Sequence, residues 1–471
     1  RGEPHFRQLE RAAIHETLQG EAPLVLACGG GTITDAAARA ELCDAALLVL
    51  LDAPDPVLIE RLGAATGRPL LQPDRRSRIA ALRQERAAAY GTAHLRIDAT
   101  APADAVAATV AKRAEAIAVR IAGARYHAVA GSGVLRHIAE HLPATASKVA
   151  IIHDAAVEHA VPSLDGPARQ AGFETVTLSL AAGEQVKSWR CAGELLDRLA
   201  AAGIGRHDCI VALGGGSIGD VAGFVAATYL RGVAWINVPS TLLAMVDSAI
   251  GGKTGVNLAA GKNLAGAVWQ PRAVLCDVSL LQALPQRAFR SAFAEIVKYC
   301  MIGDLPSPGG LEQRLDALLG RDPDALSEVI GQCIEAKAAL VADDARELGV
   351  RAVLNYGHTA GHAVETALGH GTVLHGEAVA AGMRVAGRLS RELLGCPDSD
   401  IEWQDAQLQR AGLGEVPRPD LQEVRRHMMV DKKSIAGEPR WVLLRRRGVP
   451  RFGVQAPAAA VDAALRQVLA A

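Results

Sequence analysis

One glycine-rich segment, Gly214-Gly215-Gly216-Ser217-Ile218-Gly219-Asp220, constrains the fold of this chain more than any other feature. It follows a short apolar run, Cys209 to Leu213, and opens a helical pattern that runs towards Tyr229. Glycines in a strand-turn-helix let a phosphate approach the backbone, and the free amides of the helix start attract anions. No acidic residue ends the next strand, Asn237-Val238-Pro239, so the segment alone is equally consistent with dinucleotide binding and with a tight turn.

Further apolar runs of strand length surround this segment and alternate with helical patterns. They are Tyr126 to Ala130, Lys148 to Ile152, Glu174 to Leu178, Ala234 to Val238 and Ala273 to Asp277. Such alternation is typical of a parallel sheet with crossover helices. The sequence therefore predicts a Rossmann-like α/β domain over residues 122–285.

The two ends of the chain have different patterns. Residues 1–118 contain strand-like runs at Leu24 to Ala27 and Leu47 to Asp52 within helical sequence, which predicts a separate α/β unit. Residues 286–471 are mainly helical in periodicity, with one strand expected at Arg440 to Leu444. The helices expected in this last part are Ser291 to Met301, Leu326 to Ala342 and Glu377 to Leu393.

Charge and cysteine usage exclude several classes of protein. Lys and Arg number 50 against 51 Asp and Glu, so no overall field favours nucleic acid or an anionic membrane. The 8 cysteines form no CxxC pair, which is typical of reduced thiols. The longest apolar stretches, such as Ala46 to Leu51, are far too short to span a membrane, and no signal peptide opens the sequence. We expect a cytoplasmic protein that acts on a small molecule.

Two histidines of the helical part, His358 and His362, are spaced to share one face of a helix. His375 and Glu295 lie in the same helical part, so the sequence offers a His/His/Glu set that leaves one coordination position open, as a catalytic zinc requires. Residues at this spacing more often have ordinary structural roles than bind a metal, so spacing alone does not decide between the two. A second match, His137 to His141, fits the H-x-x-E-H pattern of zinc proteases, but we expect it on the solvated face of an amphipathic helix.

Several cations stand beside glycines and polar residues, although most Lys and Arg residues simply cover a protein surface. Lys253 and Lys262 bracket a glycine-rich neutral segment, which suits the binding of a phosphate or a carboxylate. Gly252-Lys253-Thr254 resembles the end of a P-loop, but Asp247 occupies the position where that motif needs glycine. The other cations of this kind are Arg231, Lys298, Lys337 and Arg351.

Seven segments taken together closely resemble the 3-dehydroquinate synthase family, in unbroken order over residues 125–450. They are Gly214 to Asp220, Pro239 to Ser248, Gly251 to Thr254, Gly261 to Leu264, Ala294 to Lys298, Asn355 to His362 and Leu374 to Glu377. The resemblance implies conversion of 3-deoxy-D-arabino-heptulosonate 7-phosphate to 3-dehydroquinate and phosphate. The steps would be transient NAD-dependent oxidation, phosphate elimination, re-reduction and aldol cyclisation. A related sugar phosphate cyclase with another substrate is the alternative.

The resemblance also implies roles for individual residues. Glu295, His358 and His375 would bind Zn²⁺ or Co²⁺. Asp247 would orient a substrate hydroxyl, and Arg231 would reach the site of a neighbouring subunit, which implies a homodimer. The remaining substrate-binding residues would be Lys253, Asn263, Lys298, Lys337, Arg351, Asn355, His362 and Lys433, the last in the pair Lys432-Lys433.

For NAD, the resemblance points to the glycine-rich segment and to three flanking parts of the chain. The implied residues are Gly183, Glu184, Lys187, Gly215, Gly216, Ser217, Ile218, Gly219, Asp220, Ser240, Thr241, Lys253 and Lys262. The chain departs from the family pattern at Ala182, where an aspartate is usual.

The first 118 residues resemble the later part of the shikimate kinase family. The matching residues that would bind shikimate or ATP phosphates are Arg7, Gly30, Gly31, Arg68 and Arg86. The nucleotide-binding P-loop that precedes these motifs in that family is missing, which implies a kinase fused to the synthase in a longer protein. We therefore expect this P-loop-kinase-like remnant to pack poorly and not to phosphorylate shikimate unaided. The alternative is a noncatalytic interaction module.

Overall fold

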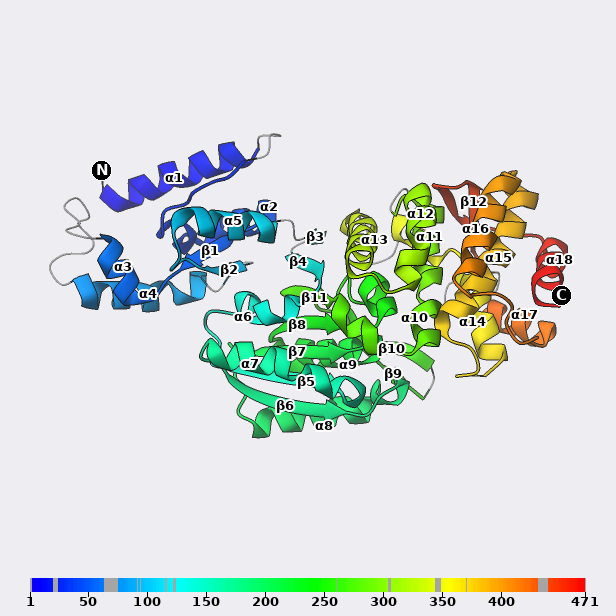
Figure 1. Ribbon diagram of the computed structural model, residues 1–471, viewed down its shortest axis with the longest axis horizontal. Helices are drawn as coiled ribbons and strands as arrows, with labels where there is room; N and C mark the ends of the chain where they lie inside the picture. The colour runs from blue at the N-terminus through cyan, green and yellow to red at the C-terminus, as the bar shows by residue number, and fades with distance from the viewer. Residues whose placement is uncertain are drawn as a thin grey trace.

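The computed structural model contains three units that follow one another along the chain (Figure 1). It describes residues 2–19, 24–62, 75–90, 92–93, 95–114, 117–121, 124–259, 261–303, 306–343, 349–369, 371–430 and 439–470. In the described helices, no stretch is both long enough and apolar enough to cross a membrane.

The first unit is a small α/β assembly built on a two-stranded parallel sheet, β1-β2. Its buried cluster is small: Ile14, Ile33, Ala38 and Leu42. The elements are α1 (Gly2–Leu18), α2 (Ala36–Ala45), β1 (Val49–Asp52), α3 (Asp55–Leu62), α4 (Arg75–Tyr90), β2 (Leu95–Asp98) and α5 (Ala103–Ala114).

The second unit is a seven-stranded sheet with the order β3-β4-β11-β8-β7-β5-β6. All neighbouring strands are parallel except the edge pair β3-β4. Its strands are β3 (Ile117–Ile121), β4 (Ala124–Gly131), β5 (Lys148–Asp154), β6 (Glu174–Leu180), β7 (Cys209–Gly214), β8 (Ala234–Pro239) and β11 (Ala273–Asp277). Its helices are α6 (Ile138–His141), α7 (Pro162–Gln170), α8 (Trp189–Ala201) and α9 (Gly216–Thr228). An antiparallel hairpin, β9 (Lys253–Leu258) and β10 (Gly261–Val268), packs on α9.

The third unit is mainly helical and carries one short antiparallel hairpin, β12-β13. Its helices are α10 (Gln286–Ser291), α11 (Phe293–Ile302), α12 (Pro308–Leu319), α13 (Pro323–Asp343), α14 (His358–Ala367), α15 (His375–Leu394), α16 (Asp398–Arg410), α17 (Leu421–Val430) and α18 (Ala458–Leu469). Its strands are β12 (Trp441–Arg446) and β13 (Val449–Val454).

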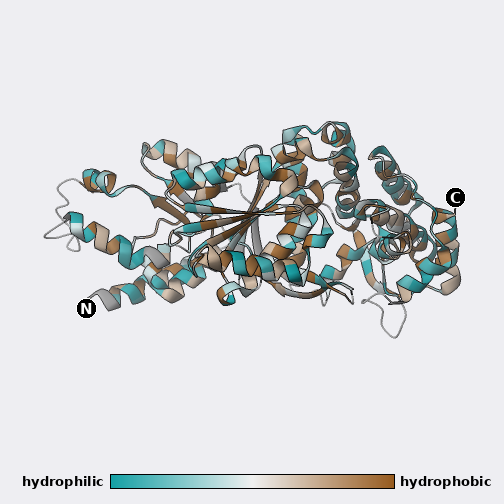
Figure 2. Ribbon diagram, turned by 90° about the horizontal axis from the view of Figure 1, so that it is seen from below, coloured by the Kyte–Doolittle hydropathy of each residue, from teal (hydrophilic) through white to brown (hydrophobic). Residues whose placement is uncertain are grey.

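The central strands are apolar on both faces because helices cover both sides of the sheet, as the brown strands between helices show in Figure 2. One face packs against α8 and α9, and the opposite face packs against α6 and α7. Tyr126 on β4 and Val274 on β11 join a third cluster that continues into α11, α13 and α15. The sheet and the helical unit therefore share one continuous core. This core holds the two units together at the boundary where the candidate site lies.

The predicted fold class is correct, and so are the strands expected in the parallel sheet. The strand expected at Leu24 to Ala27 is wrong. No described strand pairs with this segment, which leaves the Val25 side chain almost fully exposed, and an isolated strand is not stable. Edge strand β3, just before the first strand expected in the parallel sheet, was not predicted. The β9-β10 hairpin and β13 were not predicted.

The helix expected at His137 to His141 is also shorter and less exposed than predicted. The His137 ring Nδ1 lies 2.9 Å from Glu140 Oε1, as a surface pair would. His141, however, is buried, so the expected solvated face is wrong for this side chain. It packs at the point where the first and second units meet, because the Arg272 guanidinium bonds both to the His141 carbonyl oxygen and to that of Ala93.

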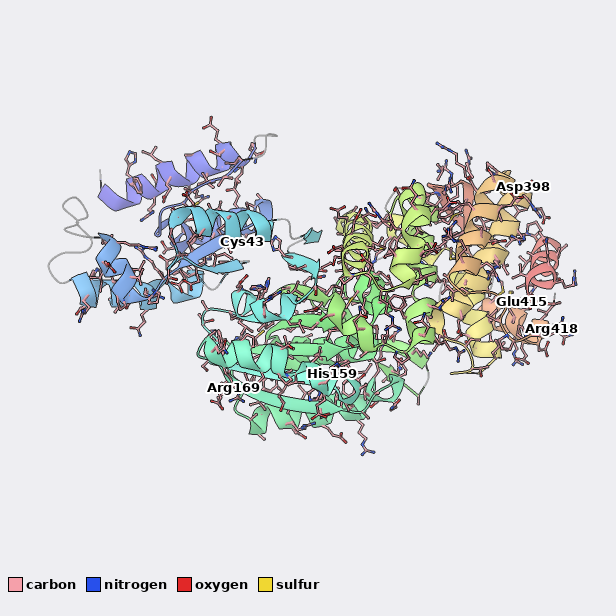
Figure 3. All side chains as sticks on the ribbon, in the orientation of Figure 1. Cys43, His159, Arg169, Asp398, Glu415 and Arg418 are labelled. Atoms are coloured by element: carbon pink, nitrogen blue, oxygen red, sulfur yellow. The ribbon has the colours of Figure 1, made fainter. Side chains whose placement is uncertain are left out.

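The cysteines carry no disulfide, as the sequence predicts. Cys43 on α2, labelled in Figure 3, lies with its Sγ 3.8 Å from the Thr92 carbonyl oxygen. Burial raises the pKa of Cys276 and Cys333 in the shared core, so these thiols stay protonated and behave as small apolar side chains.

Candidate active site

Three helices of the third unit begin at the same place, and each carries one candidate metal ligand in its first turn. Glu295 lies in the first turn of α11, His358 is the first residue of α14, and His375 is the first residue of α15. Helix starts carry partial positive charge, so their convergence favours a carboxylate and other anions. The three ligand atoms lie within 4.8 Å of one another.

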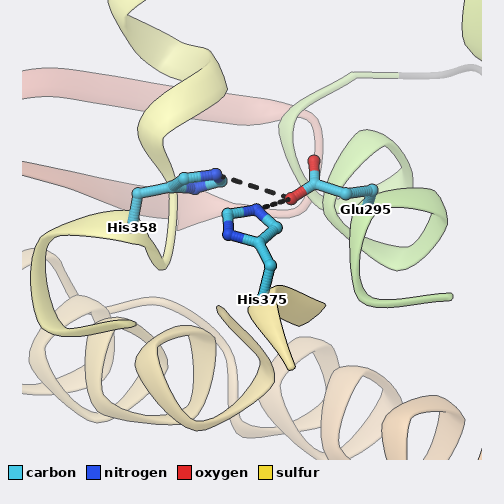
Figure 4. A group of neighbouring side chains, drawn as sticks. All are labelled: Glu295, His358 and His375. Carbon is cyan, nitrogen blue, oxygen red and sulfur yellow. Dashed lines mark ion pairs between the residues drawn. The ribbon is translucent and has the colours of Figure 1, made fainter. Parts of the chain in front are cut away.

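Both imidazoles face the same carboxylate oxygen of Glu295 (Figure 4). Its Oε1 lies 3.5 Å from His358 Nε2 and 3.5 Å from His375 Nε2. The Glu295 side chain is fully buried, and Oε1 has no hydrogen-bond partner, whereas Oε2 is ion-paired with Lys298. A buried carboxylate is costly unless a cation compensates it, and Lys298 lies only at Oε2. Oε1 and the two imidazole nitrogens that face it therefore fit a bound metal ion.

The outer nitrogens of both rings face acceptors. His358 Nδ1 lies 3.2 Å from the Tyr356 carbonyl oxygen, and His375 Nδ1 lies 3.9 Å from Glu365 Oε2. Outer acceptors of this type fix the orientation of a metal-binding histidine. In both cases Nε2 is the nitrogen turned towards Glu295.

The three ligands affect one another's pKa values because they are buried and lie close together. Burial alone would raise the pKa of Glu295, but Lys298 and the two imidazoles outweigh it and hold the pKa well below its ordinary value. Burial lowers the pKa of His358 well below its ordinary value. Burial also acts to lower the pKa of His375, but contacts with Glu295 and Glu365 raise it to about 9.

Close helix packing brings the ligands together, and glycines permit it. A Cβ added at Gly376 would overlap the Ser291 carbonyl oxygen, and one at Gly382 would overlap the Gly357 carbonyl oxygen. Gly357, just before His358, also has a left-handed φ of 82°. Larger residues at these positions would push α15 away from its neighbours and displace His375.

Two buried lysines lie beside the candidate metal position. Lys298 is paired with Glu295, one helical turn away on α11. Lys337 Nζ on α13 lies 2.7 Å from Asp247 Oδ1 and donates to the Asp247 carbonyl oxygen at 2.5 Å. Burial would raise the pKa of Asp247, but Lys337 and Lys298 lower it to about 2. Tyr299, also buried, has its hydroxyl 3.4 Å from Asp247 Oδ1.

Asp247 lies in a single π-helical turn, Ala244–Ser248, which is closed by the bond from Ala249 N to the Ala244 carbonyl oxygen. Such turns are frequent at functional sites because they redirect a side chain. In the next turn, the Arg351 guanidinium lies against the backbone of Gly251. A Cβ at Gly251 would lie only 2.8 Å from Arg351 Nη2, so glycine leaves room for this side chain. The Gly251 amide donates to the buried Tyr126 hydroxyl at 3.0 Å, which anchors this turn to β4.

The other predicted substrate-binding residues lie on segments around this cluster. The His362 ring lies edge-on to His358, with ring centroids 5.3 Å apart, and 6.0 Å from the ring centroid of His375. Asn355 ends the 3₁₀ turn that leads to His358. Asn263, on β10, has a left-handed φ of 55°, and its amide donates to Asn257 Oδ1. Lys253 begins β9 and is exposed. Lys433 falls outside the described residues.

The glycine-rich segment forms the predicted turn between β7 and α9. Gly215 is the N-cap of α9 and offers no side-chain cap, and Gly216 begins the helix. A Cβ at Gly216 would lie 2.9 Å from Ser248 Oγ, so glycine keeps this turn against the π-helical segment. A small pocket between the two is lined by Gly215, Gly216, Gly219, Asp220 and Lys253, among others.

The implied NAD residues outside the glycine-rich segment come to the same helix start. Glu184 accepts from Ser217 Oγ at 2.6 Å and from Asn257 Nδ2 at 2.8 Å, so it joins α9 to the hairpin. Lys187 is buried and paired with Asp220. The remaining members lie around this junction: Gly183 caps the turn of Glu184, Ile218 and Gly219 lie in α9, Ser240 and Thr241 follow β8, and Lys262 lies in β10.

Arg231 lies in a strained turn after α9. Leu230 and Arg231 have left-handed φ values of 48° and 64°. The Arg231 side chain is exposed, and within the described residues it has no hydrogen bond or ion pair. Exposed aliphatic side chains lie nearby in sequence or on the adjacent hairpin: Leu230, Leu264 and Val268.

In the first unit, the structure brings together the predicted residues that it describes. Arg7 pairs with Glu10 at 2.6 Å and crosses above Gly31, where any Cβ would overlap its guanidinium. A Cβ at Gly30 would lie 3.2 Å from Arg86 Nη1, and the Tyr90 hydroxyl donates to the Gly30 carbonyl oxygen. Arg68 falls outside the described residues.

Two residues of the site, Glu365 and Tyr299, were missed by sequence reasoning. Glu365 on α14 lies with Oε1 3.0 Å from Lys262 Nζ and with Oε2 near His375. These contacts, the one with His375 first, lower the pKa of Glu365 to about 2. The signal that could have found it is its spacing, since His358, His362 and Glu365 follow the i, i+4, i+7 pattern of one helix face.

Comparison with protein families covers all three units. Residues 177–291 match the family model described as 3-dehydroquinate synthase N-terminal, and residues 292–434 match 3-dehydroquinate synthase C-terminal. A 3-dehydroquinate synthase from Acidithiobacillus ferrooxidans is 43% identical over 346 residues, which is 71% of this chain and 93% of the relative. The chain belongs to the 3-dehydroquinate synthase family. Residues 1–116 match the model described as shikimate kinase.

Solved structures show the same architecture with cofactors bound. A 2-deoxy-scyllo-inosose synthase complexed with carbaglucose-6-phosphate, NAD⁺ and Co²⁺ is 28% identical, with a TM-score of 0.70 over 75% of this chain and 100% of the other. A 2-epi-5-epi-valiolone synthase from Streptomyces hygroscopicus subsp. jinggangensis, with NAD⁺ and Zn²⁺ bound, is 25% identical, with a TM-score of 0.66 over 72% of this chain and 96% of the other. Members of this wider group therefore use a dinucleotide and a divalent metal in the fold described above.

Proposed function

We propose that this chain is a 3-dehydroquinate synthase, which converts 3-deoxy-D-arabino-heptulosonate 7-phosphate to 3-dehydroquinate and phosphate with NAD and a divalent metal. The observation that carries the proposal is the convergence of Glu295, His358 and His375 beside two buried lysines and the glycine-rich helix start. The named relative that shares 43% identity along 93% of its length supports this substrate over that of another sugar phosphate cyclase.

Glu295, His358 and His375 would hold Zn²⁺ or Co²⁺, because they offer one carboxylate and two imidazoles with the outer nitrogens already directed to acceptors. When bound, the metal supplies Lewis-acid polarisation of a substrate hydroxyl. The fully buried Glu295 keeps its negative charge here, because Lys298 and the imidazoles hold its pKa low.

The lysines and Arg351 bind the anionic groups of the substrate. Lys298 and Lys337 are buried, so a carboxylate that reaches them is attracted more strongly than it would be at a wet surface. Arg351 and Lys253 lie at the glycine turn that also borders the pocket of α9, which places cations for a phosphate near the dinucleotide. Asp247, held by Lys337 and Tyr299, presents an ionised acceptor for a hydroxyl.

NAD would bind across the start of α9. The uncapped amides of this helix suit a pyrophosphate, and Gly215, Gly216 and Gly219 leave room for its approach. No acid ends β8, but Glu184, at the turn before α8, lies against Ser217 and is a candidate partner for a ribose hydroxyl. Hydride transfer is the chemistry that NAD supplies when it is bound.

A homodimer is part of the proposal. Arg231 is exposed, without a partner in its own chain as described, and lies in a strained turn beside exposed Leu230. Strained left-handed residues persist where surrounding structure holds them, and this pair gains such support when a second copy covers it. We place this chain in the cytoplasm, since its cysteines are all free, including exposed Cys28.

We assign the first unit to a shikimate-binding role, because Arg7, Arg86 and the glycines at 30 and 31 form one cluster. A binding measurement distinguishes this role from the alternative, a noncatalytic interaction module. Shikimate titrated into the full chain, followed by calorimetry, gives heat that is lost in Arg86→Ala in the first case and gives none in the second.

The experiment that tests the synthase assignment is a stoichiometry measurement. The metal-reconstituted chain is incubated with NAD and the seven-carbon phosphate substrate, and inorganic phosphate and dehydroquinate are both quantified. Equal, metal-dependent formation of both, lost in His375→Ala, is the expected result. Absence of dehydroquinate from protein that holds metal and NAD would refute the assignment and favour another cyclase substrate.

A further inference from the structure

Glu365 is placed between two parts of the site that lie on different units. Its side chain on α14 is largely buried, with 17% of its surface exposed. One oxygen, Oε1, lies 3.0 Å from Lys262 Nζ on the β9-β10 hairpin. The other oxygen, Oε2, lies 3.9 Å from His375 Nδ1 on α15. Each oxygen thus faces a different nitrogen, Lys262 Nζ or His375 Nδ1, and rotation of the carboxylate would lose one contact or the other.

The two candidate metal-binding histidines differ in how their rings are held. The His358 ring is the more buried, and its outer nitrogen faces a backbone carbonyl of the preceding turn. The His375 side chain is 30% exposed, and the acceptor facing its outer nitrogen is a side chain that comes from another helix. The orientation of His375 therefore depends on the side chain of Glu365, whereas the orientation of His358 depends on a backbone carbonyl.

We propose that Glu365 is a positioning residue that turns His375 Nε2 towards the metal position and ties this ligand to the β9-β10 hairpin through Lys262. The proposal rests on the proposed function in one respect, namely that His375 binds the metal. A carboxylate on the outer nitrogen of a metal-bound histidine fixes the ring and increases its basicity as a ligand. Lys262 fixes the carboxylate in turn, so an element of the dinucleotide-binding unit supports the metal centre.

The test is Co²⁺ binding to the metal-free full chain without substrate, followed by the visible absorption spectrum of the bound ion. Glu365→Gln keeps the shape of the side chain and removes its charge. We expect Co²⁺ affinity to fall by about 10- to 100-fold and the absorption bands to shift, because the ligand ring loses its anchor. Glu402→Gln, an exposed charge removal on α16, is the matched control and keeps both affinity and spectrum.

Glu365→Asp is the second variant and covers the case in which the first fails to fold. Aspartate retains the negative charge but is shorter by one methylene, so its carboxylate lies farther from His375. A Co²⁺ affinity between those of wild type and Glu365→Gln therefore supports the proposal. In the double variant with Lys262→Met, we expect no loss beyond that of Glu365→Gln alone, because both changes act through one carboxylate. A folded Glu365→Gln protein with affinity within about threefold of wild type and an unchanged spectrum would overturn the proposal. A wild-type chain that binds no Co²⁺ would instead refute the metal centre of the proposed function.

Discussion

At the scale of single residues, the site depends on buried charges that are satisfied by one another. The buried Lys337 and the partly exposed Asp247 are such a pair, and both come from outside the metal-binding helices. Burial lowers the pKa of Lys337, while its contact with Asp247 opposes that change. Removing one partner leaves the other without compensation in a protein interior.

We therefore expect Asp247→Asn to lower the free energy of unfolding by about 3 kcal/mol, the cost of an uncompensated buried charge. The double variant Asp247→Asn with Lys337→Met should recover part of this loss, because no charge is then stranded. Urea unfolding of the two single variants and the double variant measures the coupling. Strictly additive losses would show that the pair does not interact.

Asp208 supplies a pH-dependent contribution far from the chemistry. It accepts from the amides of Gly205, Ser147 and Lys148, and so joins the starts of β5 and β7. Burial would raise the pKa of Asp208, but these hydrogen bonds outweigh it and lower the pKa. A lowered pKa in the folded state gives stability that is complete above the unfolded value, about 3.9, and is lost as pH falls through the folded value.

Asp208→Asn should consequently destabilise the chain by about 1–3 kcal/mol at pH 7, because one amide loses its acceptor. The difference from wild type should shrink as pH is lowered below 3.8, where the native carboxylate becomes protonated. Urea midpoints measured at decreasing pH give this difference directly. Asp197→Asn, on the exposed face of α8, is the control and should show no such trend.

At the scale of elements, close contacts between helices set the geometry of the ligands. Helix periodicity predicted α11, α13 and α15, and the strand-turn-helix pattern predicted β7 and α9. Neither pattern could predict that α15 approaches α14 closely enough for Gly382 to contact the Gly357 carbonyl. That contact depends on tertiary packing, which leaves no signature in the sequence beyond the glycines themselves.

Gly382→Ala should show the importance of this contact. We expect a loss of about 1–3 kcal/mol in stability from overpacking, accompanied by weaker metal binding because His375 moves with α15. Thermal unfolding and Co²⁺ titration check the two effects. Gly193→Ala on α8, where a Cβ meets nothing within 4 Å, is the matched control and should stabilise the helix by about 0.5–1 kcal/mol.

The candidate site shows the same division between what the sequence predicts and what it does not. Family resemblance pointed to Glu295, His358 and His375, and the structure brings these three together. It did not reveal Glu365 or Tyr299, because their contacts reach across elements that are distant in sequence. The β9-β10 hairpin was missed because glycines within both strands weaken the apolar pattern on which strand prediction depends.

At the scale of the whole molecule, the first unit is held differently from the other two. The second and third units share a continuous core, whereas the first has a small cluster of its own and exposes Leu24, Val25 and Leu26. Arg272 links it to the sheet through the carbonyl oxygens of Ala93 and His141. Stability is therefore expected to be uneven along the chain.

Limited proteolysis should cut within residues 1–118 first and leave a resistant fragment that begins near β3. Arg272→Ala should speed this cleavage several-fold, because the buried link to Ala93 is lost, while the fragment itself stays resistant. Mass spectrometry of the time course identifies the sites. Equal resistance of both parts in the wild-type chain would show that the first unit is packed as firmly as the rest.

The convergence of three helix starts at Glu295, His358 and His375 has a consequence for the life of the protein in a cell. An ion held there is a removable cross-link between segments that are distant along the chain, and it exists only while the helical unit is assembled. By mass action, a metal at 1,000 times its dissociation constant adds about 4 kcal/mol to the folded state. Metal shortage would then expose the chain to degradation, so that supply of the ion governs the abundance of this protein as well as its rate of turnover.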